Sequence, residues 1–214
     1  MGIELVIFDM DGLMFDTENV TFRAYMEIGK ERGLVTNRQQ YVQILGLKQE
    51  DIEKIYRGFF GEDFDAAKFY CDVAQRKLDI LGREGMPIKP GLLELLEELE
   101  KRNIKRAVAS GSSIDTIEGY LVQSGLTEKF DMILSSQSVK RGKPAPDVFL
   151  KVCEKMKVEP GRALVLEDSI NGVQAAVAGG IKVIAVPDMI SIPHELQKQC
   201  YDVVKTLEDV KNRL

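Results

Sequence analysis

The stretch IELVIFDMDG, at residues 3–12, decides the fold that this sequence predicts. Its first six residues are mostly apolar and rich in strand-forming types, which is typical of a strand buried on both faces of a sheet. Asp9, Asp11 and Gly12 follow at once. Ligands of open α/β sheets bind at the carboxyl ends of the strands. The stretch therefore predicts a core strand with a functional site directly behind it.

The chain beyond residue 87 alternates strand-like with helix-like segments. Such alternation predicts a mostly parallel sheet with helices on both faces, which is a three-layer, Rossmann-like α/β core. Further strands are predicted at residues 105–109, 131–134, 163–166 and 182–186. Helices are predicted at residues 92–102, 113–124, 146–156, 170–178 and 207–213.

The segment at residues 16–86 interrupts this rhythm after the first strand. It is helical by pattern, and the turn-rich stretch PIKPG at residues 87–91 follows it. We therefore expect a small all-helical cap domain at residues 16–86, inserted into an α/β core made of residues 1–15 and 87–214. The alternative is that these helices pack on the sheet as part of one domain.

The composition narrows the classes of function. Of the 214 residues, 44% are hydrophobic and 29% are charged, with a net charge of −5, which is ordinary for a globular protein. An acidic chain gives no reason to expect a nucleic-acid partner. The N-terminal residues do not resemble a signal peptide, and no apolar run is long enough for a membrane helix. The three scattered cysteines are typical of reduced thiols, so we expect a cytoplasmic monomer without a membrane partner.

Polar residues suited to phosphate chemistry also follow the other predicted strands. They are Ser110, Gly111 and Ser112 after the second strand, Lys143 after the third, and Glu167 and Asp168 after the fourth. Crowded carboxylates require a cation, and oxygen ligands without histidine or cysteine suit Mg²⁺. A lysine beside them indicates a phosphoryl group whose charge must be balanced. Aspartate can attack phosphorus, and a second aspartate can serve as general acid and base. Gly12 and Gly111 would let the backbone turn its N–H groups toward a phosphate.

Each of these signals has a structural alternative. Asp-x-Asp-Gly alone also occurs in turns and calcium loops, although no glutamate stands here at the calcium-loop spacing. Taken singly, Lys143 fits a solvated turn, Ser110 fits a helix cap, and adjacent acidic residues fit a helix start. The joint pattern on four strand ends favours an active site.

Four motifs, in this order, resemble those of the haloacid dehalogenase superfamily. They are DMDGLMFDTE (9–18), VASGSS (108–113), GKPAPDVF (142–149) and LEDSINGVQAA (166–176). The resemblance covers essentially the whole chain. It points to the branch with a helical cap after the first motif, similar to β-phosphoglucomutase. It implies an Mg²⁺-dependent phosphatase of a small phosphorylated metabolite, either a sugar phosphate or a nucleotide-like compound, that works through an aspartyl-phosphate.

The resemblance also implies a role for each matching residue. The implied catalytic residues are Asp9 as nucleophile, Asp11 as general acid and base, Ser110 as holder of the phosphoryl group, and Lys143 as its counter-charge. The implied metal ligands are Asp9, the backbone carbonyl of Asp11, Glu167 and Asp168. The expected substrate-binding residues are Thr17, Glu18, Lys48, Gly111, Ser112 and Asn171.

A phosphomutase similar to β-phosphoglucomutase is the main alternative. The mutase pattern has a histidine where this chain has Thr21, and a cap-loop arginine where this chain has Gln49. Arginine holds a distal phosphate better than an amide does, so both departures favour hydrolysis, although Lys48 could substitute in part. Asp11 argues against a dehalogenase, because that kind of member lacks an aspartate there. A non-catalytic binding module is a third possibility, disfavoured because clustered like charges without a function only destabilise a protein.

Overall fold

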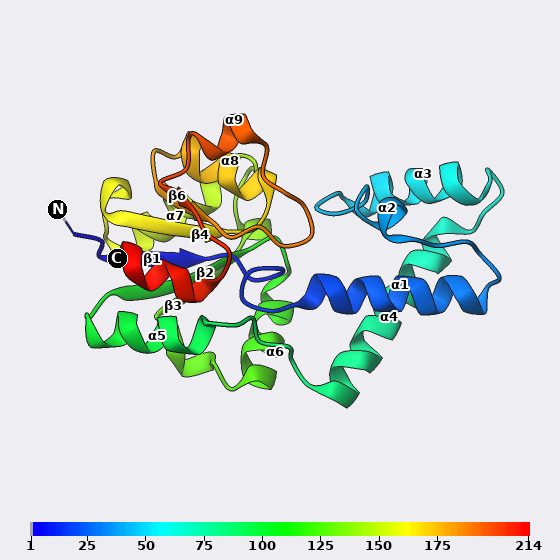
Figure 1. Cartoon of the computed structure of the whole chain (residues 1–214), viewed down its shortest axis with the longest axis horizontal. Helices are drawn as coiled ribbons and strands as arrows, with labels where there is room; N and C mark the ends of the chain where they lie inside the picture. The colour runs from blue at the N-terminus through cyan, green and yellow to red at the C-terminus, as the bar shows by residue number, and fades with distance from the viewer. Residues whose placement is uncertain (1) are drawn as a thin grey trace. The chain divides into compact units, whose positions relative to one another are not determined.

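The α/β part of the chain is built on a six-stranded parallel sheet. The structure is a computed structural model that describes residues 2–214, and its strand order is β3-β2-β1-β4-β5-β6 (Figure 1). The strands are β1 (Leu5–Phe8), β2 (Lys105–Ser110), β3 (Met132–Ser135), β4 (Ala163–Glu167), β5 (Lys182–Ala185) and β6 (Asp202–Val203). Every neighbouring pair runs parallel, so the predicted fold class is confirmed.

The register brings the carboxyl ends of the central strands together. Phe8, the last residue of β1, pairs with Val108 of β2 on one side and Leu166 of β4 on the other. The residues that follow these three, Asp9, Ala109 and Glu167, therefore lie next to one another. This edge of the sheet is where open α/β folds bind ligands.

Helices cover both faces of the sheet, and strand alternation decides which residues each face buries. Odd-numbered strand residues such as Ile7 and Val165 pack with Phe149 of α7 and Val173 of α8 in one fully buried cluster. The other face meets α5, which contacts β2 and also packs on α10 (Figure 1). The α/β helices are α5 (Leu92–Lys101), α6 (Ile114–Ser124), α7 (Asp147–Met156), α8 (Ile170–Ala178), α9 (His194–Gln197) and α10 (Leu207–Val210). Short 3₁₀ turns lie at Thr127–Lys129, Ser136–Ser138, Pro160–Arg162 and Lys211–Arg213.

The chain divides into two compact units. One consists of Met1–Asp16 with Ile88–Leu214, and the other is Thr17–Pro87. The boundaries predicted from the sequence, after residue 15 and after residue 86, each lie one residue earlier in the chain. That the second unit acts as a cap stays a prediction.

The helical unit has an aromatic core of its own. Its helices are α1 (Thr17–Glu31), α2 (Arg38–Tyr41), α3 (Gln49–Phe60) and α4 (Ala66–Glu84). Tyr25, Tyr56 and Phe69 are buried and lie with ring centroids 5.0–6.0 Å apart. Rings bury large apolar areas, so a few of them stabilise a small bundle. Asn37 and Asp65 cap α2 and α4 by accepting backbone N–H hydrogen bonds.

Both chain segments that connect the units are tied down within the α/β unit. Phe15, at the end of the first segment, forms isolated β-bridges with Asp11 and with Ile88. The N–H group of Lys89 donates to the Met14 carbonyl at 2.9 Å. The Lys89 ammonium donates to Asp188 at 2.7 Å and lies 3.5 Å from Asp16. The loop that carries Asp11 is therefore held at both of its ends.

Two short elements were absent from the sequence prediction. The strand β6 has only two residues, and α9 has four, too few for either to show a hydrophobic period. The predicted strand starting at residue 3 begins at Leu5, and the final predicted helix turns into a 3₁₀ turn after Val210.

Gly91 offers a direct test of the packing of α5 on α10. Its φ is +85°, and a Cβ atom there would lie 2.3 Å from the backbone nitrogen of Glu208. We expect Gly91→Ala to lower the free energy of unfolding by about 2 kcal/mol, because the backbone conformation and the clash both oppose the methyl group. Urea denaturation followed by circular dichroism measures this change.

Gly119 in α6 is the matched control. A methyl group there meets nothing within 4 Å. Because alanine favours helix, Gly119→Ala should raise the free energy of unfolding by about 0.5 to 1 kcal/mol. Equal stability of the two variants would contradict the packing described here.

Candidate active site

A buried lysine joins two carboxylates at the carboxyl edge of the sheet. The Lys143 ammonium donates to Asp9 Oδ1 at 2.5 Å, to Glu167 Oε1 at 2.6 Å, and to the carbonyl oxygen of Ala109 at 3.0 Å. The Lys143 side chain is 10% exposed, that of Asp9 11%, and that of Glu167 0%. Lys143 also lies over the ring of Phe149, 4.9 Å from its centroid. Charges so poorly hydrated persist only when they are paired and hydrogen-bonded, as these are.

Burial and neighbouring charges shift the pKa values of Asp9 and Lys143. Burial raises the pKa of Asp9 to about 8, against the opposing attraction of Lys143, and the charges of Glu167 and Asp11 raise it further. Burial alone would lower the pKa of Lys143, but the charges of Asp9 and Glu167 outweigh it and raise that pKa. A further cation beside Asp9 would favour its ionised, nucleophilic form.

Three carboxylates are arranged as a metal ion requires. Oxygen atoms of Asp9, Glu167 and Asp168 all lie within 4.8 Å of one another. These ligands are hard oxygen donors, which Mg²⁺ prefers. Three carboxylates stand against the single ammonium group of Lys143, so a divalent cation would bring the cluster to neutrality. On both counts the residues present fit the predicted ion.

Two glycines make the close approach of these carboxylates possible. A Cβ atom at Gly172 would lie 1.7 Å from Glu167 Oε1, and one at Gly12 would lie 2.3 Å from Asp168 Oδ2. Gly12 also has a φ of +81°, which favours glycine. Gly111 has no positive φ, and a Cβ atom there meets nothing within 4 Å, so its expected role in turning an N–H group toward a phosphate stays a prediction.

Ser169 fixes Glu167 and the start of α8 at the same time. Its hydroxyl accepts from the Gly172 N–H group at 3.1 Å, which caps the helix, and donates to Glu167 Oε2 at 2.9 Å. The backbone N–H group of Ser169 donates to the same oxygen at 2.9 Å. Ser169 therefore joins the start of α8 to the Glu167 side chain.

The predicted residues after β2 face the same edge. Ser110 is 1% exposed, and its hydroxyl accepts the N–H group of Ser112 at 3.0 Å. The Ser112 hydroxyl donates to Asp11 Oδ2 at 2.9 Å. The α/β unit thus holds all six predicted catalytic and metal-binding residues, namely Asp9, Asp11, Ser110, Lys143, Glu167 and Asp168. Ser110 and Glu167 are the last residues of β2 and β4, and the other four lie beyond strand ends.

Three of the predicted substrate residues do not belong to the α/β unit. Thr17, Glu18 and Lys48 belong to the helical unit. Glu18 accepts the hydroxyl of Tyr41 at 2.8 Å, and Lys48 is exposed at the start of α3. Asn171 is exposed in the first turn of α8. Their contacts with a substrate stay a prediction.

Two further residues at the sheet edge were missed by the sequence reasoning. Ser135 ends β3, and its hydroxyl donates to the Ser112 carbonyl oxygen at 2.6 Å. Asp188, which binds Lys89, follows β5. Both lie at or just beyond the ends of predicted strands. The signal that marks Asp9, a polar residue close behind a strand, therefore marks them as well.

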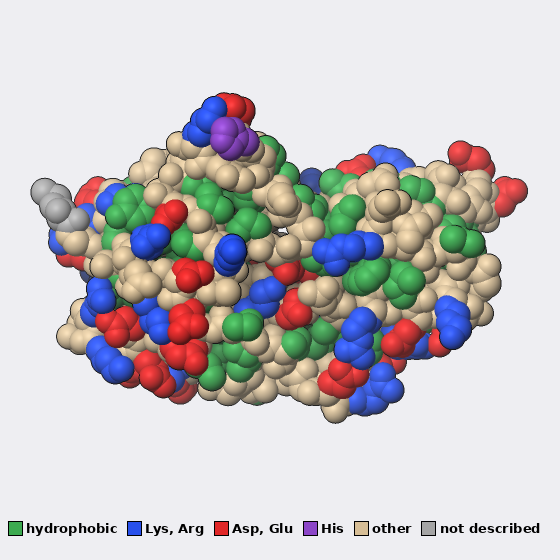
Figure 2. Space-filling model, viewed as in Figure 1, with side chains coloured by type: hydrophobic (Ala, Val, Ile, Leu, Met, Phe, Trp, Pro, Cys, Tyr) green, Lys and Arg blue, Asp and Glu red, His purple; other side chains and the backbone are tan. Residues whose placement is uncertain are grey.

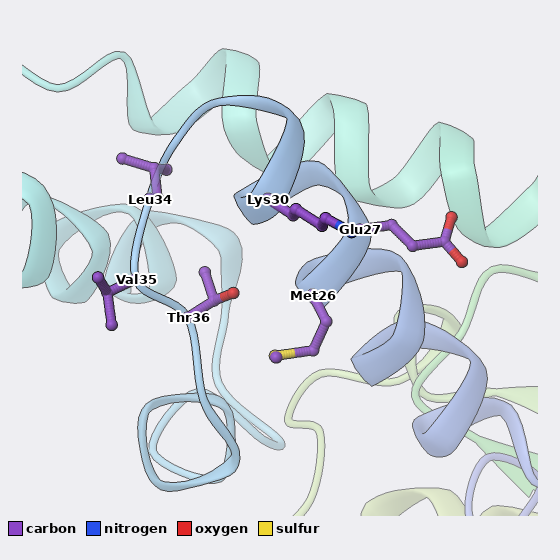
Figure 3. A pocket seen from close by; sticks show the side chains of 6 residues that line it. All are labelled: Met26, Glu27, Lys30, Leu34, Val35 and Thr36. Carbon is purple, nitrogen blue, oxygen red and sulfur yellow. The ribbon is translucent and has the colours of Figure 1, made fainter.

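A separate hollow lies in the helical unit. It is lined by Met26, Glu27, Lys30, Leu34, Val35 and Thr36 (Figure 3). Figure 3 shows Glu27 projecting away from the Leu34–Thr36 segment, and Arg76 binds its carboxylate at 2.8 Å. Polar groups therefore do not converge in this hollow as they do in small-molecule sites.

The surface charges and the helices are relevant to the predicted absence of nucleic-acid and membrane partners. On the face that Figure 2 draws, lysine and arginine side chains of the α/β unit alternate with aspartate and glutamate side chains. The expected absence of a nucleic-acid partner stays a prediction. Among residues 2–214, no helix combines the length and the apolar character needed to cross a lipid bilayer.

The chain is similar to known proteins both in sequence and in fold. A family model described as haloacid dehalogenase-like hydrolase matches residues 6–186. The phosphorylated carbohydrates phosphatase of Thermotoga maritima is 31% identical over 180 residues, which are 84% of this chain and 83% of the relative. Hexitol phosphatase B of Escherichia coli (strain K12) is 28% identical over 182 residues, which are 85% of this chain and 82% of the relative. The crystal structure of CbbY from Rhodobacter sphaeroides in complex with phosphate has a TM-score of 0.79 and 27% identity, covering 97% of this chain and 96% of that one.

Removing the buried ammonium group should destabilise the protein. We expect Lys143→Met to lower the free energy of unfolding by about 3 kcal/mol at pH 7 in EDTA, because it leaves two buried carboxylates without their cation. The raised pKa of Lys143 means that its charge, and hence the stabilisation, is present throughout the range below its normal pKa. Chemical denaturation measures the loss.

Two further variants identify the cause. Adding Asp9→Asn to Lys143→Met should restore part of the lost stability, since one of the unpaired charges is then removed. Lys151→Met removes an exposed lysine that pairs with Glu154 on α7 and should cost less than about 1 kcal/mol. A double variant no more stable than Lys143→Met would contradict the ion-pair account.

Proposed function

Because the chain belongs to the haloacid dehalogenase-like hydrolases, we propose that it is a Mg²⁺-dependent phosphatase that cleaves small phosphomonoesters through an aspartyl-phosphate on Asp9. The observation that carries the proposal is the position of the Asp9 carboxylate. It is buried, it is bonded to Lys143 at 2.5 Å, and it lies in one cluster with Glu167 and Asp168. A nucleophile aimed at an anionic phosphoryl group needs this compensation of charge.

The first half-reaction forms the covalent intermediate. A carboxylate oxygen of Asp9 attacks phosphorus, the bond from phosphorus to the ester oxygen breaks, and Asp11 gives its proton to the departing alcohol. Ser110 and nearby backbone N–H groups hold the phosphoryl oxygens. Lys143 stabilises the negative charge that they carry.

The second half-reaction restores the enzyme. Asp11, now a carboxylate, takes a proton from a water molecule, the water oxygen bonds to phosphorus, and the bond between phosphorus and Asp9 breaks. Inorganic phosphate leaves, and Asp11 is again protonated. The same residue thus acts first as acid and then as base.

We propose Asp9, Asp168 and the backbone carbonyl of Asp11 as the direct ligands of Mg²⁺. Both carboxylate oxygens of Glu167 already accept hydrogen bonds, from Lys143 and from Ser169. This supports a role for Glu167 through a water molecule of the ion. When bound, Mg²⁺ would polarise the phosphoryl group and offset the charge of the surrounding carboxylates.

The names of the relatives support a phosphorylated sugar or polyol as the substrate. One relative is a phosphatase of phosphorylated carbohydrates and another is a hexitol phosphatase. Thr17, Glu18 and Lys48 of the helical unit are the residues we propose for contact with the leaving group, and Gly111 and Asn171 those on the α/β unit. The three free cysteines fit the proposed reducing, cytoplasmic environment.

Phosphomutase activity is the second function to be tested. A mutase must hold a distal phosphate, and Gln49 stands where the mutase pattern has an arginine. The Gln49 amide donates to Glu53 at 2.9 Å along the exposed side of α3. An amide engaged in this way is a poor phosphate ligand, which supports hydrolysis over transfer.

The test is phosphate release from a panel of sugar, polyol and nucleoside monophosphates, with Mg²⁺ and after treatment with EDTA. β-Glucose 1-phosphate is included, with its bisphosphate activator. We expect Mg²⁺-dependent release from one or a few sugar or polyol phosphates, and loss of activity with EDTA. Conversion of β-glucose 1-phosphate to glucose 6-phosphate with little free phosphate would instead establish the mutase.

Asp9→Asn tests the nucleophile. We expect kcat to fall by about 10⁴-fold or more, because an amide cannot form the intermediate. Circular dichroism should remain that of the wild type. Asp115→Asn, at an exposed position in the first turn of α6, is the control and should keep full activity. Wild-type turnover by Asp9→Asn would refute the mechanism.

A further inference from the structure

The side chain of Asp11 is held by a residue of a different loop. The Ser112 hydroxyl donates to Asp11 Oδ2 at 2.9 Å, across 101 positions of the sequence. From the sequence, Ser112 is expected to bind the substrate. In the structure, the Ser112 hydroxyl group is instead engaged with the proposed general acid and base.

Ser112 is itself fixed on both sides of its backbone. Its N–H group donates to Ser110 Oγ at 3.0 Å, and its carbonyl oxygen accepts the Ser135 hydroxyl at 2.6 Å. Ser135 is only 5% exposed, and its own oxygen accepts the N–H group of Gln137 at 3.1 Å. The hydroxyl that reaches Asp11 therefore projects from a rigid part of the sheet edge rather than from a mobile loop.

The backbone of Asp11 is equally restrained. The N–H group of Gly12 donates to the Phe15 carbonyl at 2.9 Å, and Asp11 forms a β-bridge with Phe15. With the backbone held, the orientation of the Asp11 carboxyl group depends on the two torsion angles of its side chain. A general acid is effective only when its proton points at the leaving oxygen within hydrogen-bond reach.

We propose that Ser112 is a positioning residue for Asp11, holding the carboxyl group in the orientation needed for proton transfer to the leaving alcohol. This inference rests on the proposed function of Asp11. An oxygen that accepts the Ser112 hydrogen bond is the poorer position for a proton, so Oδ2 is the held atom and Oδ1 delivers the proton. The proton then moves from Asp11 Oδ1 to the ester oxygen as the bond between that oxygen and phosphorus breaks.

The proposal predicts a dependence on the leaving group. Phenolate is a strong base, whose acid, like a tyrosine side chain, keeps its proton up to about pH 10. 4-Nitrophenolate is a much weaker base and leaves without help. A misplaced general acid should therefore impair hydrolysis of phenyl phosphate far more than hydrolysis of 4-nitrophenyl phosphate, although the two esters bind through the same phosphoryl group.

The experiment compares kcat/KM for these two esters, with Mg²⁺, in the wild type and in Ser112→Ala. The value of kcat/KM reports the steps up to departure of the leaving group. We expect Ser112→Ala to lower kcat/KM for phenyl phosphate at least about tenfold more than for 4-nitrophenyl phosphate, the size of effect expected when one hydrogen bond is lost. Ser112→Thr keeps the hydroxyl and should restore most of the difference.

Ser113→Ala is the matched control. Ser113 caps α6 by accepting the Thr116 N–H group at 3.2 Å, so this variant should lower thermal stability without changing the ratio between the two esters. Ser135→Ala releases the Ser112 carbonyl and should shift the ratio in the same direction as Ser112→Ala. This second variant tests the proposal even if Ser112→Ala folds poorly.

The outcomes separate this inference from the proposed function. Equal losses on both esters, or a rise in KM alone, would overturn the positioning role and return Ser112 to substrate binding, while the phosphatase mechanism would stand. Failure of the wild type to release phosphate with Mg²⁺ from these esters and from every member of the substrate panel would overturn both.

Discussion

The rest of the site depends on one buried ammonium group. Lys143 lies between Asp9 and Glu167, within 2.6 Å of an oxygen of each, in a part of the sheet edge that water hardly reaches. This cation offsets the mutual repulsion of the two carboxylates. The pairing of β1 with β2 and β4 fixes where the two acids stand. Lys143 therefore connects the arrangement of the strands with the chemistry proposed for Asp9.

The site is also built with very little spare space. Glu167 and Asp168 fit only because Gly172 and Gly12 lack side chains. The Ser169 hydroxyl both caps α8 and donates a hydrogen bond to Glu167, so the helix and the charge cluster stabilise each other. Such a network restricts the movement of its members. That precision is what transfer of a phosphoryl group requires, since catalysis there is mainly positioning and electrostatic stabilisation.

Each of the two units has a core of its own. The chain belongs to the family of haloacid dehalogenase-like hydrolases, and its α/β unit carries the residues that we propose contact phosphorus and metal. The helical unit is stabilised separately, by rings such as Tyr25 and Phe69. A unit with its own core can change its surface residues without disturbing the catalytic ones. This is consistent with assigning the choice of leaving group to residues such as Lys48.

The sequence by itself determined the α/β core, the inserted helical segment and most of the charged site, because buried strands show continuous apolar runs and parallel strands present their carboxyl ends at one edge. It could not reveal β6, which is too short to show a period. Only the tertiary structure decided that Ser112 contacts Asp11 and that Ser135 holds Ser112. Those contacts join residues far apart in the chain, and the physical reason is register: which side chains meet depends on how neighbouring strands align, and local sequence does not encode that alignment.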